Sequence, residues 1–379
     1  MVTAFDITLT RRTVFEPGAL LQVGRLAVEF GQRALLVIGG ASAQRSGALD
    51  RARVAVVEAG VDVEQFAGVE RDPTVETADS AAAVARQGRF DSVIGLGGGS
   101  VMDCAKAVAM LAGNDGAAAD YQLGERTVQR KGLPFIAVPT TSGTGSESNR
   151  VAVLTNRALS IKKAVAHPLM VPDVALLDPE LALTLPRYET AYTGIDALSH
   201  AAEAYVSLNS TPITEAFALR ALELVGRSLA RACADGSGLA ARSDMTLASA
   251  LAGAALNAGV GCAHILAHPL GATFGVPHGV AIASVLPQVF AANAGASPER
   301  YTRIARALCP EREISAEEAL RDLLRRIGFE PRLSAHGVSA EHFDTLYGGI
   351  EKSMRHVTTN PKPATYELLQ SIFEASLRA

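Results

Sequence analysis

Short apolar runs alternate with helical segments through the first half of the chain. Each run is rich in aliphatic residues and is bounded by glycine or proline, which is typical of a buried strand. The four clearest runs are 33–40, 61–68, 92–100 and 134–141. Helical periodicity lies between them, as at 46–59. This alternation predicts a parallel sheet with crossover helices.

The pattern changes near residues 180–186. Beyond Pro186 there are few β-branched runs, and alanine and leucine recur at helical spacing. The stretches 214–234 and 244–268 each predict a long helix. We therefore expect an α/β domain over residues 1–183 and an all-helical domain over residues 184–379.

Composition narrows the classes of function. The 379 residues are 48% hydrophobic and 20% charged, and the net charge of −4 comes from both signs scattered along the chain. Without a basic stripe, nucleic acid is not expected as a partner. The N-terminal segment lacks the apolar core of a signal peptide, and no long uncharged apolar run predicts a membrane span. Four widely spaced cysteines without a CxxC pair favour reduced thiols in the cytoplasm.

Two polar loops follow neighbouring predicted strands. The first, GLGGGSVMD at 95–103, joins a strand to a helix, so its glycine N–H groups and the helix N-terminus suit a pyrophosphate. Its G-x-G-x-x-S spacing is a weak dinucleotide fingerprint, and a tight turn is the alternative interpretation. The second, TTSGTGSES at 140–148, follows the next strand. Together they predict one nucleotide cleft at the carboxyl edge of the sheet.

Histidines gather in the predicted helical domain. His264 and His268 are four residues apart on one helix, and His278 follows in a PHG turn. Asp196 and His200 are also four apart on a helix, so each pair shares one face. Imidazoles and a carboxylate converging on one point would suit a divalent cation. The alternative is that each is an ordinary hydrogen-bonded residue, and Glu203, on the same face as His200, is interpreted as a supporting residue.

Four motifs in combination resemble those of the iron-containing, or group III, alcohol dehydrogenases. They are GLGGGSVMDCAKA (95–107), VPTTSGTGSE (138–147), TGIDALSHAAEAYVS (193–207) and HILAHPLGATFGVPHGVA (264–281). The resemblance extends over nearly the whole chain, including VPDVALLDPELALTLP (171–186) and NPKPAT (360–365). It implies a Rossmann-like dinucleotide-binding domain, an all-α metal-binding domain and a cleft between them.

The resemblance also implies roles for individual residues. Asp196, His200, His264 and His278 match the four metal ligands, and His268 matches a non-ligand histidine beside the substrate. The motif match further implies a set of cofactor contacts: Gly97, Gly98, Gly99, Ser100, Asp103, Thr140, Thr141, Ser142 and Lys162. The metal implied is Fe²⁺, although Zn²⁺ or another divalent ion could take the same ligands. The expected reaction interconverts a small primary alcohol and its aldehyde by hydride transfer.

The loop after the first predicted strand departs from many NAD-preferring relatives. Those relatives carry an aspartate that binds the ribose 2′-hydroxyl, whereas this chain has Gly39. An acidic side chain would repel a 2′-phosphate and glycine does not. Gly39, Gly40 and Ser42 resemble the loop of NADPH-using relatives, with Arg45 and Lys162 as sources of positive charge. We therefore expect NADP(H) to be favoured over NAD(H), the alternative being that Gly39 only serves the turn.

Residues 146–153 are expected to line the cleft beyond the cofactor loop. In a strand, Asn149 and Val151 would face one side and belong to the substrate pocket, while Arg150 would point away. If Arg150 or Lys362 faced the cleft, a small anionic aldehyde or keto acid, such as phosphonoacetaldehyde or succinate semialdehyde, would be a suitable substrate. The sequence does not choose between the neutral and the anionic class.

Other readings of the chain are less well supported. The metal-free maleylacetate reductases have a similar fold but depart from the set of one aspartate and three histidines that this chain contains. Glycerol dehydrogenases and dehydroquinate synthases use zinc and are more distant relatives of this chain. A non-catalytic nucleotide- or metal-binding protein is the alternative from another class. The segments FDITLT and RTVFEPG resemble strands of dimeric relatives that pair across a two-fold axis, which predicts a homodimer.

Overall fold

The computed structural model describes residues 4–354 and 357–378. A six-stranded sheet forms the centre of the N-terminal half, and all its paired strands are parallel. In spatial order the strands are β1 (Arg12–Phe15), β8 (Val174–Leu177), β5 (Phe135–Pro139), β4 (Ser92–Gly97), β2 (Arg33–Ile38) and β3 (Asp62–Phe66). The four predicted strands are all present, and each ends before the polar or glycine residues that follow it.

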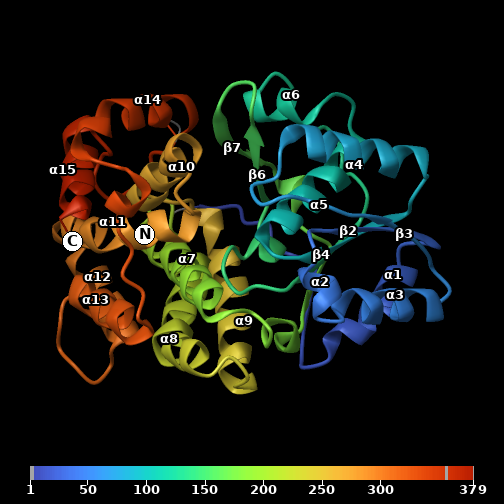
Figure 1. The fold of residues 1–379 in the computed structure, drawn as a ribbon, viewed down its shortest axis with the longest axis horizontal. Helices are drawn as coiled ribbons and strands as arrows, with labels where there is room; N and C mark the ends of the chain where they lie inside the picture. Colours follow the sequence, from blue (N-terminus) through green and yellow to red (C-terminus); the bar gives the residue numbers. More distant parts are fainter. Residues whose placement is uncertain (1–3, 355–356, 379) are drawn as a thin grey trace.

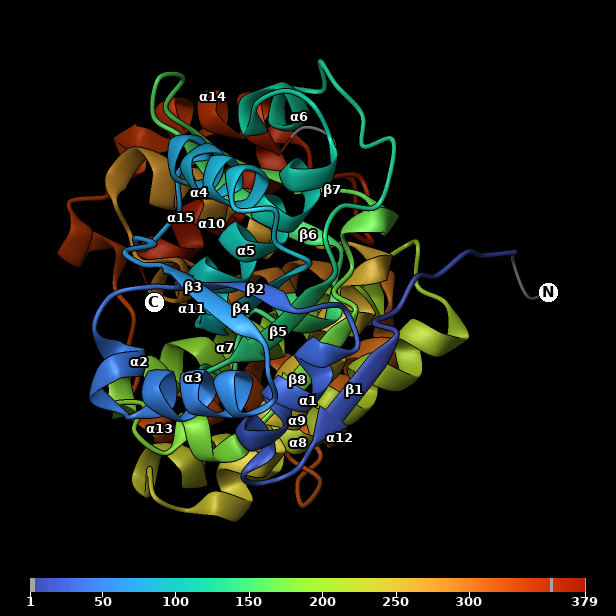
Figure 2. The same cartoon turned by 90° about the vertical axis from the view of Figure 1, so that its right-hand side faces the viewer.

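The register of the sheet explains why its strands are apolar on both faces. Leu36, Ile94, Ile136 and Val174 lie side by side across four strands and belong to one buried cluster. Neighbouring residues such as Leu35 face the opposite cluster. Helices α1 (Val23–Val28) and α3 (Ala48–Glu58) cover the first face, and α4 (Val75–Gln87) and α5 (Gly99–Gly113) cover the second (Figure 2). Because both faces are covered by helices, the strands read as continuous apolar runs.

The C-terminal half is helical, as predicted (Figure 1). One large apolar cluster joins its helices. They are α7 (Arg187–Val206), α8 (Pro212–Ala234), α9 (Leu239–Ala255), α10 (Cys262–Phe274), α11 (His278–Asn293), α12 (Pro298–Leu308), α13 (Ala316–Ile327), α14 (Phe343–Ser353) and α15 (Tyr366–Leu377). One described stretch, His278–Ala296, has the length and apolar character of a membrane span, but 72% of it is buried inside the molecule, as in a core helix.

The prediction of a single helix over 244–268 is wrong. The chain bends by 104° between α9 and α10. Gly259 adopts a φ of +88°, a left-handed conformation that side chains other than glycine rarely adopt, and Gly261 precedes α10. The break matters for the site, because it turns α10 and its two histidines toward α7.

The alternation of Asn149 and Val151 was argued for the case that residues 146–153 form a strand, but this segment begins with a 3-10 turn at Ser146–Ser148. The strand β6 starts only at Val151 and pairs with β7 (Ile161–Ala166) in an antiparallel hairpin that sequence analysis did not anticipate. This hairpin contacts α5 on one side, and α10 and α14 on the other. It therefore joins the α/β half to the helical half.

The N-terminal segments also behave differently from the expectation that both pair with another copy. Arg12–Phe15 pairs in parallel with β8 of its own chain and forms one edge of the sheet. Residues 4–10 are extended without forming a strand, and they run away from the sheet (Figure 2). The outer edge of β1 has no partner strand within the described residues.

Candidate metal centre and cofactor cleft

Four side chains that are distant in sequence meet between α7, α10 and α11. Asp196 and His200 lie one turn apart on α7, His264 lies in the first turn of α10, and His278 is the first residue of α11. Ligand atoms of Asp196, His200 and His264 lie within 4.8 Å of one another. The Nε2 atoms of His278, His200 and His264 lie 3.4, 3.8 and 4.0 Å from Asp196 Oδ1.

The chemistry of this group fits a cation. Asp196 Oδ1 and His264 Nε2 are buried, and neither has a hydrogen-bond partner among the described residues. Buried polar atoms without partners are costly, and most in native proteins are bound to something. Three imidazole nitrogens and one carboxylate oxygen form a donor set that divalent transition metals bind. The residues present therefore fit a divalent ion at this point.

Glu203 forms a hydrogen bond with Nδ1 of His264, the ring nitrogen that is not directed at Asp196. Its Oε2 lies 2.6 Å from His264 Nδ1 and accepts from Gly261 N at 2.8 Å, and its Oε1 accepts from Ala263 N at 2.7 Å. The carboxylate thus binds the first backbone N–H groups of α10 and fixes the Nδ1–H tautomer of the histidine. In that tautomer, Nε2 keeps its lone pair and faces Asp196.

Charge and burial set the protonation of the cluster. Burial would raise the pKa of Asp196, but the neighbouring His200 and His278 outweigh it and lower that pKa. Burial lowers the pKa of His200 to about 4, so this imidazole is neutral at neutral pH. For His264, burial opposes protonation, but the Glu203 carboxylate outweighs it and raises the pKa. The ionised carboxylate of Asp196 and the neutral ring of His200 are therefore in the state in which such groups act as ligands, whereas an ion at His264 would have to displace a proton more readily held there.

His268 lies beside these residues but is not one of the three whose ligand atoms lie within 4.8 Å of one another. It follows His264 by one turn of α10, and its ring centroid lies 6.1 Å from that of His264 and 5.4 Å from that of His278. Its Nδ1 is buried with no hydrogen-bond partner in the described part of the chain. Burial, followed by the charges of His278 and Lys162, lowers its pKa well below the usual value. The ring is therefore neutral at neutral pH.

The glycine turn and the second polar loop touch one another. Thr140 N donates to Gly97 O at 2.9 Å. A Cβ at Gly98 would lie 3.2 Å from Thr141 Cγ2, and one at Gly99 would lie 2.4 Å from Thr144 Cγ2. A side chain at position 99 would clash with Thr144 and one at position 98 would crowd Thr141, so glycine at these two positions permits the contact between the loops. The two loops predicted to form one cleft are side by side.

The second loop also reaches the helix that carries Asp196. Ser142 Oγ lies 3.3 Å from Thr246 Oγ1 on α9, and a Cβ at Gly143 would lie 2.8 Å from Thr193 Cβ on α7. Thr193 is one turn before Asp196 on the same helix. The structure therefore places this loop directly next to the helix that carries Asp196 and His200.

Three predicted contacts have other partners in the structure. Both carboxylate oxygens of Asp103 accept hydrogen bonds from within the chain, from Ser146 Oγ at 2.6 Å and from Val153 N at 3.0 Å. Asn149 is buried, and its Oδ1 accepts from Lys106 Nζ at 3.0 Å. Lys162 on β7 forms an ion pair with Asp72. Their roles toward cofactor and substrate stay predictions, and Asp103 and Asn149 have an evident structural task.

The remaining predicted cofactor residues lie at the carboxyl end of β2. Gly39 and Gly40 follow Ile38, and the one-turn helix α2 (Ser42–Arg45) begins directly afterwards. A Cβ on Gly39 would lie 3.1 Å from Val101 Cγ2 on α5, whereas one on Gly40 would meet nothing within 4 Å. Ser42 and Arg45 are exposed to solvent. This loop therefore lies beside the helix that follows the glycine turn.

Several residues near the cleft were not singled out by sequence analysis. Arg71 Nη2 donates to Tyr192 Oη at 3.1 Å, which joins the loop after β3 to α7. Asp72 adopts a φ of +57°, and its backbone N–H donates to Ser100 Oγ at 3.3 Å. Lys106 was also missed. It could have been noticed as the single cationic residue in an otherwise apolar helix, three residues after Asp103.

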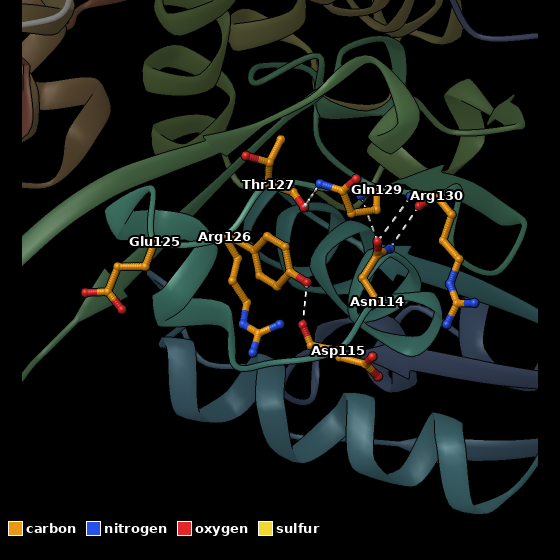
Figure 3. A pocket seen from close by; sticks show the side chains of 8 residues that line it. Asn114, Asp115, Glu125, Arg126, Thr127, Gln129 and Arg130 are labelled. Atoms are coloured by element: carbon orange, nitrogen blue, oxygen red, sulfur yellow. Dashed lines mark hydrogen bonds between the residues drawn. The ribbon is translucent and has the colours of Figure 1, made fainter.

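A separate surface cavity of about 480 Å³ lies in the α/β half (Figure 3). Its lining includes Asn114, Tyr121, Arg126 and Arg130, from the end of α5, from α6 (Ala118–Leu123) and from the following loop. None of its lining residues belongs to the histidine group or to the two polar loops. The cavity is therefore distinct from the candidate site.

Both halves of the chain match models of known protein families. A family model described as iron-containing alcohol dehydrogenase matches residues 10–179. A second, described as the C-terminal part of the Fe-containing alcohol dehydrogenase family, matches residues 190–377.

Individual relatives match over nearly the whole length. The chain is 38% identical over 382 residues to long-chain-alcohol dehydrogenase 1 of Geobacillus thermodenitrificans, with 96% of each chain covered. A solved structure of a 1,3-propanediol oxidoreductase superposes with a TM-score of 0.93 at 35% identity, covering 99% of this chain and 100% of that one. The sulfoacetaldehyde reductase of Bifidobacterium kashiwanohense, solved with NAD⁺, gives a TM-score of 0.89 at 31% identity and 99% coverage of both chains.

Proposed function

The chain belongs to the iron-containing alcohol dehydrogenase family, and from that premise we propose that Asp196, His200, His264 and His278 hold the metal ion of a nicotinamide-dependent alcohol dehydrogenase. The family and its relatives support interconversion of an alcohol and an aldehyde with NAD(P)(H) and a metal. The observation that carries the residue assignment is the meeting of three imidazole nitrogens around one buried, unpartnered carboxylate oxygen.

Each part of the site has a task in this reaction. A divalent ion bound by the four side chains would lower the pKa of an alcohol oxygen or polarise a carbonyl. Glu203 would keep the His264 Nε2 lone pair free for the ion, and Asp196, His200 and His264 are buried while His278 is partly exposed. His268, whose buried Nδ1 has no hydrogen-bond partner among the described residues, is the candidate to relay the alcohol proton, and its lowered pKa means that the ring would pass the proton on rather than keep it. The glycine turn and the Thr140–Ser142 segment would bind the dinucleotide and orient its ring.

Metal content of two histidine variants tests the assignment. We expect H264A to lose the metal after loading with Fe²⁺ or Zn²⁺ and gel filtration, because a core ligand is gone. The matched variant H268A, one turn away on the same helix, should keep the metal and lose turnover. Equal metal content in wild type and H264A would overturn the ligand set, and a metal-free H268A would make His268 a ligand.

We propose further that the cofactor preference is for NADP(H). The support is the absence of an acidic side chain at Gly39 and the exposed Arg45 at the end of α2, both in the loop after β2. Lys162 supports it less, since its ammonium is engaged with Asp72. An exposed arginine close to this loop would attract a 2′-phosphate.

A second candidate is reduction of a small anionic aldehyde. It is favoured by the similarity to a sulfoacetaldehyde reductase, and by Arg150 and Lys362, whose side chains are half-buried. A panel of neutral and anionic aldehydes at equal concentration distinguishes the two. Higher kcat/KM for the anionic members, lost in R150M or K362M, would favour this candidate over the neutral alcohol.

The assembly we propose is a homodimer in the cytoplasm. The outer edge of β1 lacks a partner strand among the described residues, and Phe5, Leu9 and Phe15 are 42%, 38% and 39% exposed nearby in the sequence. An open sheet edge with apolar side chains favours pairing with another chain. Light scattering on the purified protein tests this, and a monomer at micromolar concentration would contradict it.

A further inference from the structure

Lys106 is a lysine almost completely removed from solvent. It lies in the middle of α5, and 1% of its surface is exposed. Its Nζ donates to Ser146 Oγ at 2.8 Å, to Asn149 Oδ1 at 3.0 Å and to Val151 O at 2.6 Å. Burial lowers its pKa to about 8, so the ammonium is still the main form at neutral pH. Removing an ammonium from water is costly, and this one is compensated by acceptors from a single segment, 146–151.

Asp103 binds the same segment from the preceding turn of α5. It accepts from Ser146 Oγ at 2.6 Å and from Val153 N at 3.0 Å. Ser146 therefore donates to Asp103 and accepts from Lys106, so its hydroxyl lies between two opposite charges. Asn149 Oδ1 accepts from Val151 N at 2.9 Å as well as from Lys106. The segment 146–153 is thus fixed to one face of α5 by a closed hydrogen-bond network.

This network lies behind the contact between the two loops of the cleft. The first residue of α5 is Gly99, in the glycine turn, and the segment bound by Lys106 is the end of the loop that begins at Thr140. At the front, Gly98 and Gly99 abut Thr141 and Thr144. Further along α5, Lys106 binds the end of the second loop through Ser146 and the residues that follow it. The spacing of the two loops therefore depends on both contacts.

We propose that Lys106 is a positioning residue that sets the separation of the two cofactor loops. It touches neither cofactor nor substrate, because its ammonium is enclosed by protein acceptors. The proposal rests on the proposed function, which places the dinucleotide between these loops. It predicts that loss of the ammonium impairs cofactor binding, while the metal ligands, which lie on α7, α10 and α11, are unaffected.

The test compares K106M with V108A. K106M keeps most of the side-chain volume and removes the three donors. V108A makes a cavity two residues further along α5, in the apolar cluster against the sheet, so it destabilises the helix without touching the segment 146–151. Affinities for NADPH and NADH are measured by nucleotide fluorescence, and Zn²⁺ affinity is measured by calorimetry. Neither readout requires turnover.

We expect the Kd of K106M for both nucleotides to rise about tenfold or more, with Zn²⁺ affinity unchanged and V108A close to wild type. K106R, which restores a cation in the same place, should recover part of the affinity. Wild-type nucleotide affinity in folded K106M, or an equal loss in V108A, would overturn the proposal. If K106M does not fold, S146A decides by the same two readouts, because it opens the same network. Failure of wild type to bind either nucleotide would instead contradict the proposed function.

Discussion

His264 Nδ1 and Glu203 Oε2 lie 2.6 Å apart, and each side chain is 3% exposed. The same carboxylate accepts the N–H groups of Gly261 and Ala263 at the start of α10. Glu203 therefore connects the position of α10 to the orientation of His264, a proposed metal ligand. A carboxylate behind a ligating histidine fixes the tautomer and increases the basicity of the ligand.

Replacing Glu203 should weaken metal binding without removing a ligand. We expect E203A to lower the affinity for Zn²⁺ or Fe²⁺ by roughly 10- to 100-fold, since His264 loses its orienting acceptor. Competition with a chelator of known affinity measures this. E180A removes a half-buried carboxylate in the α/β half and is the control. An unchanged affinity in E203A would show that α10 positions His264 without Glu203.

Metal loading should stabilise the folded protein. An ion that binds only the native state at about 100 times its Kd adds about 3 kcal/mol to the free energy of unfolding. Thermal melts with and without Zn²⁺ should therefore differ by several degrees for wild type, and the difference should vanish in H264A. A shift of equal size in H264A would place the stabilising ion elsewhere.

Gly39 allows a test of cofactor preference. We expect G39D to reduce kcat/KM for NADPH by about tenfold or more relative to NADH, because a carboxylate would face the 2′-phosphate. A Cβ at this position would lie 3.1 Å from Val101 Cγ2, so the substitution also has a steric cost. G39A has the same steric cost without the charge and is the matched control. Equal changes for both cofactors in G39D would refute the electrostatic account.

Glu147 should give the protein a distinctive pH dependence. Its side chain is 1% exposed, and burial raises its pKa from 4.5 to about 7. A raised carboxyl pKa means that the folded state favours the protonated form. The stabilisation is complete below about pH 4.5 and is lost as the pH rises through about 7. Burying the charged carboxylate costs free energy, so deprotonation of Glu147 destabilises the folded state.

E147Q removes this titration. Between about pH 4.5 and 7, the stability of E147Q relative to wild type should rise by an amount on the order of 3 kcal/mol, from the pKa difference. Urea unfolding at several pH values measures it. E64Q, at an exposed position on β3, is the control for removing a glutamate charge. If the stability of E147Q relative to wild type did not change with pH, the Glu147 carboxyl would not have a raised pKa in the folded state.

Much of this molecule follows from local patterns. The central strands and the helical second half were predictable, because burial on both faces of a sheet and the 3.6-residue period are properties of consecutive residues. The grouping of Asp196, His200, His264 and His278 was predictable from the spacing of Asp196 with His200 together with the family resemblance, and their role as metal ligands stays a prediction. The periodicity of a strand or helix and the spacing within a motif are each set by residues that are close together in the chain.

Long-range contacts account for what was not predicted. The bend at Gly259 separates α9 from α10, and an alanine-rich sequence gives little sign of it apart from the glycines. The pairing of β1 with β8 joins residues more than a hundred positions apart, and the partner of Arg12 could not be read from local pattern. Asp103 and Asn149 were assigned to the cleft from motif or alternation, whereas their hydrogen bonds to Ser146 and Lys106 depend on how α5 packs.

Asp196, His200, His264 and His278 are proposed to hold a metal ion at which a nicotinamide-dependent alcohol–aldehyde reaction takes place. The most direct test is an anaerobic assay of Fe²⁺-reconstituted protein, with NADPH or NADH and a panel of neutral and anionic small aldehydes, and H264A in parallel. The account predicts oxidation of the reduced nucleotide that requires both metal and aldehyde, that is faster with NADPH, and that is absent in H264A. No turnover with either nucleotide after reconstitution, or the same rate in H264A, would contradict it.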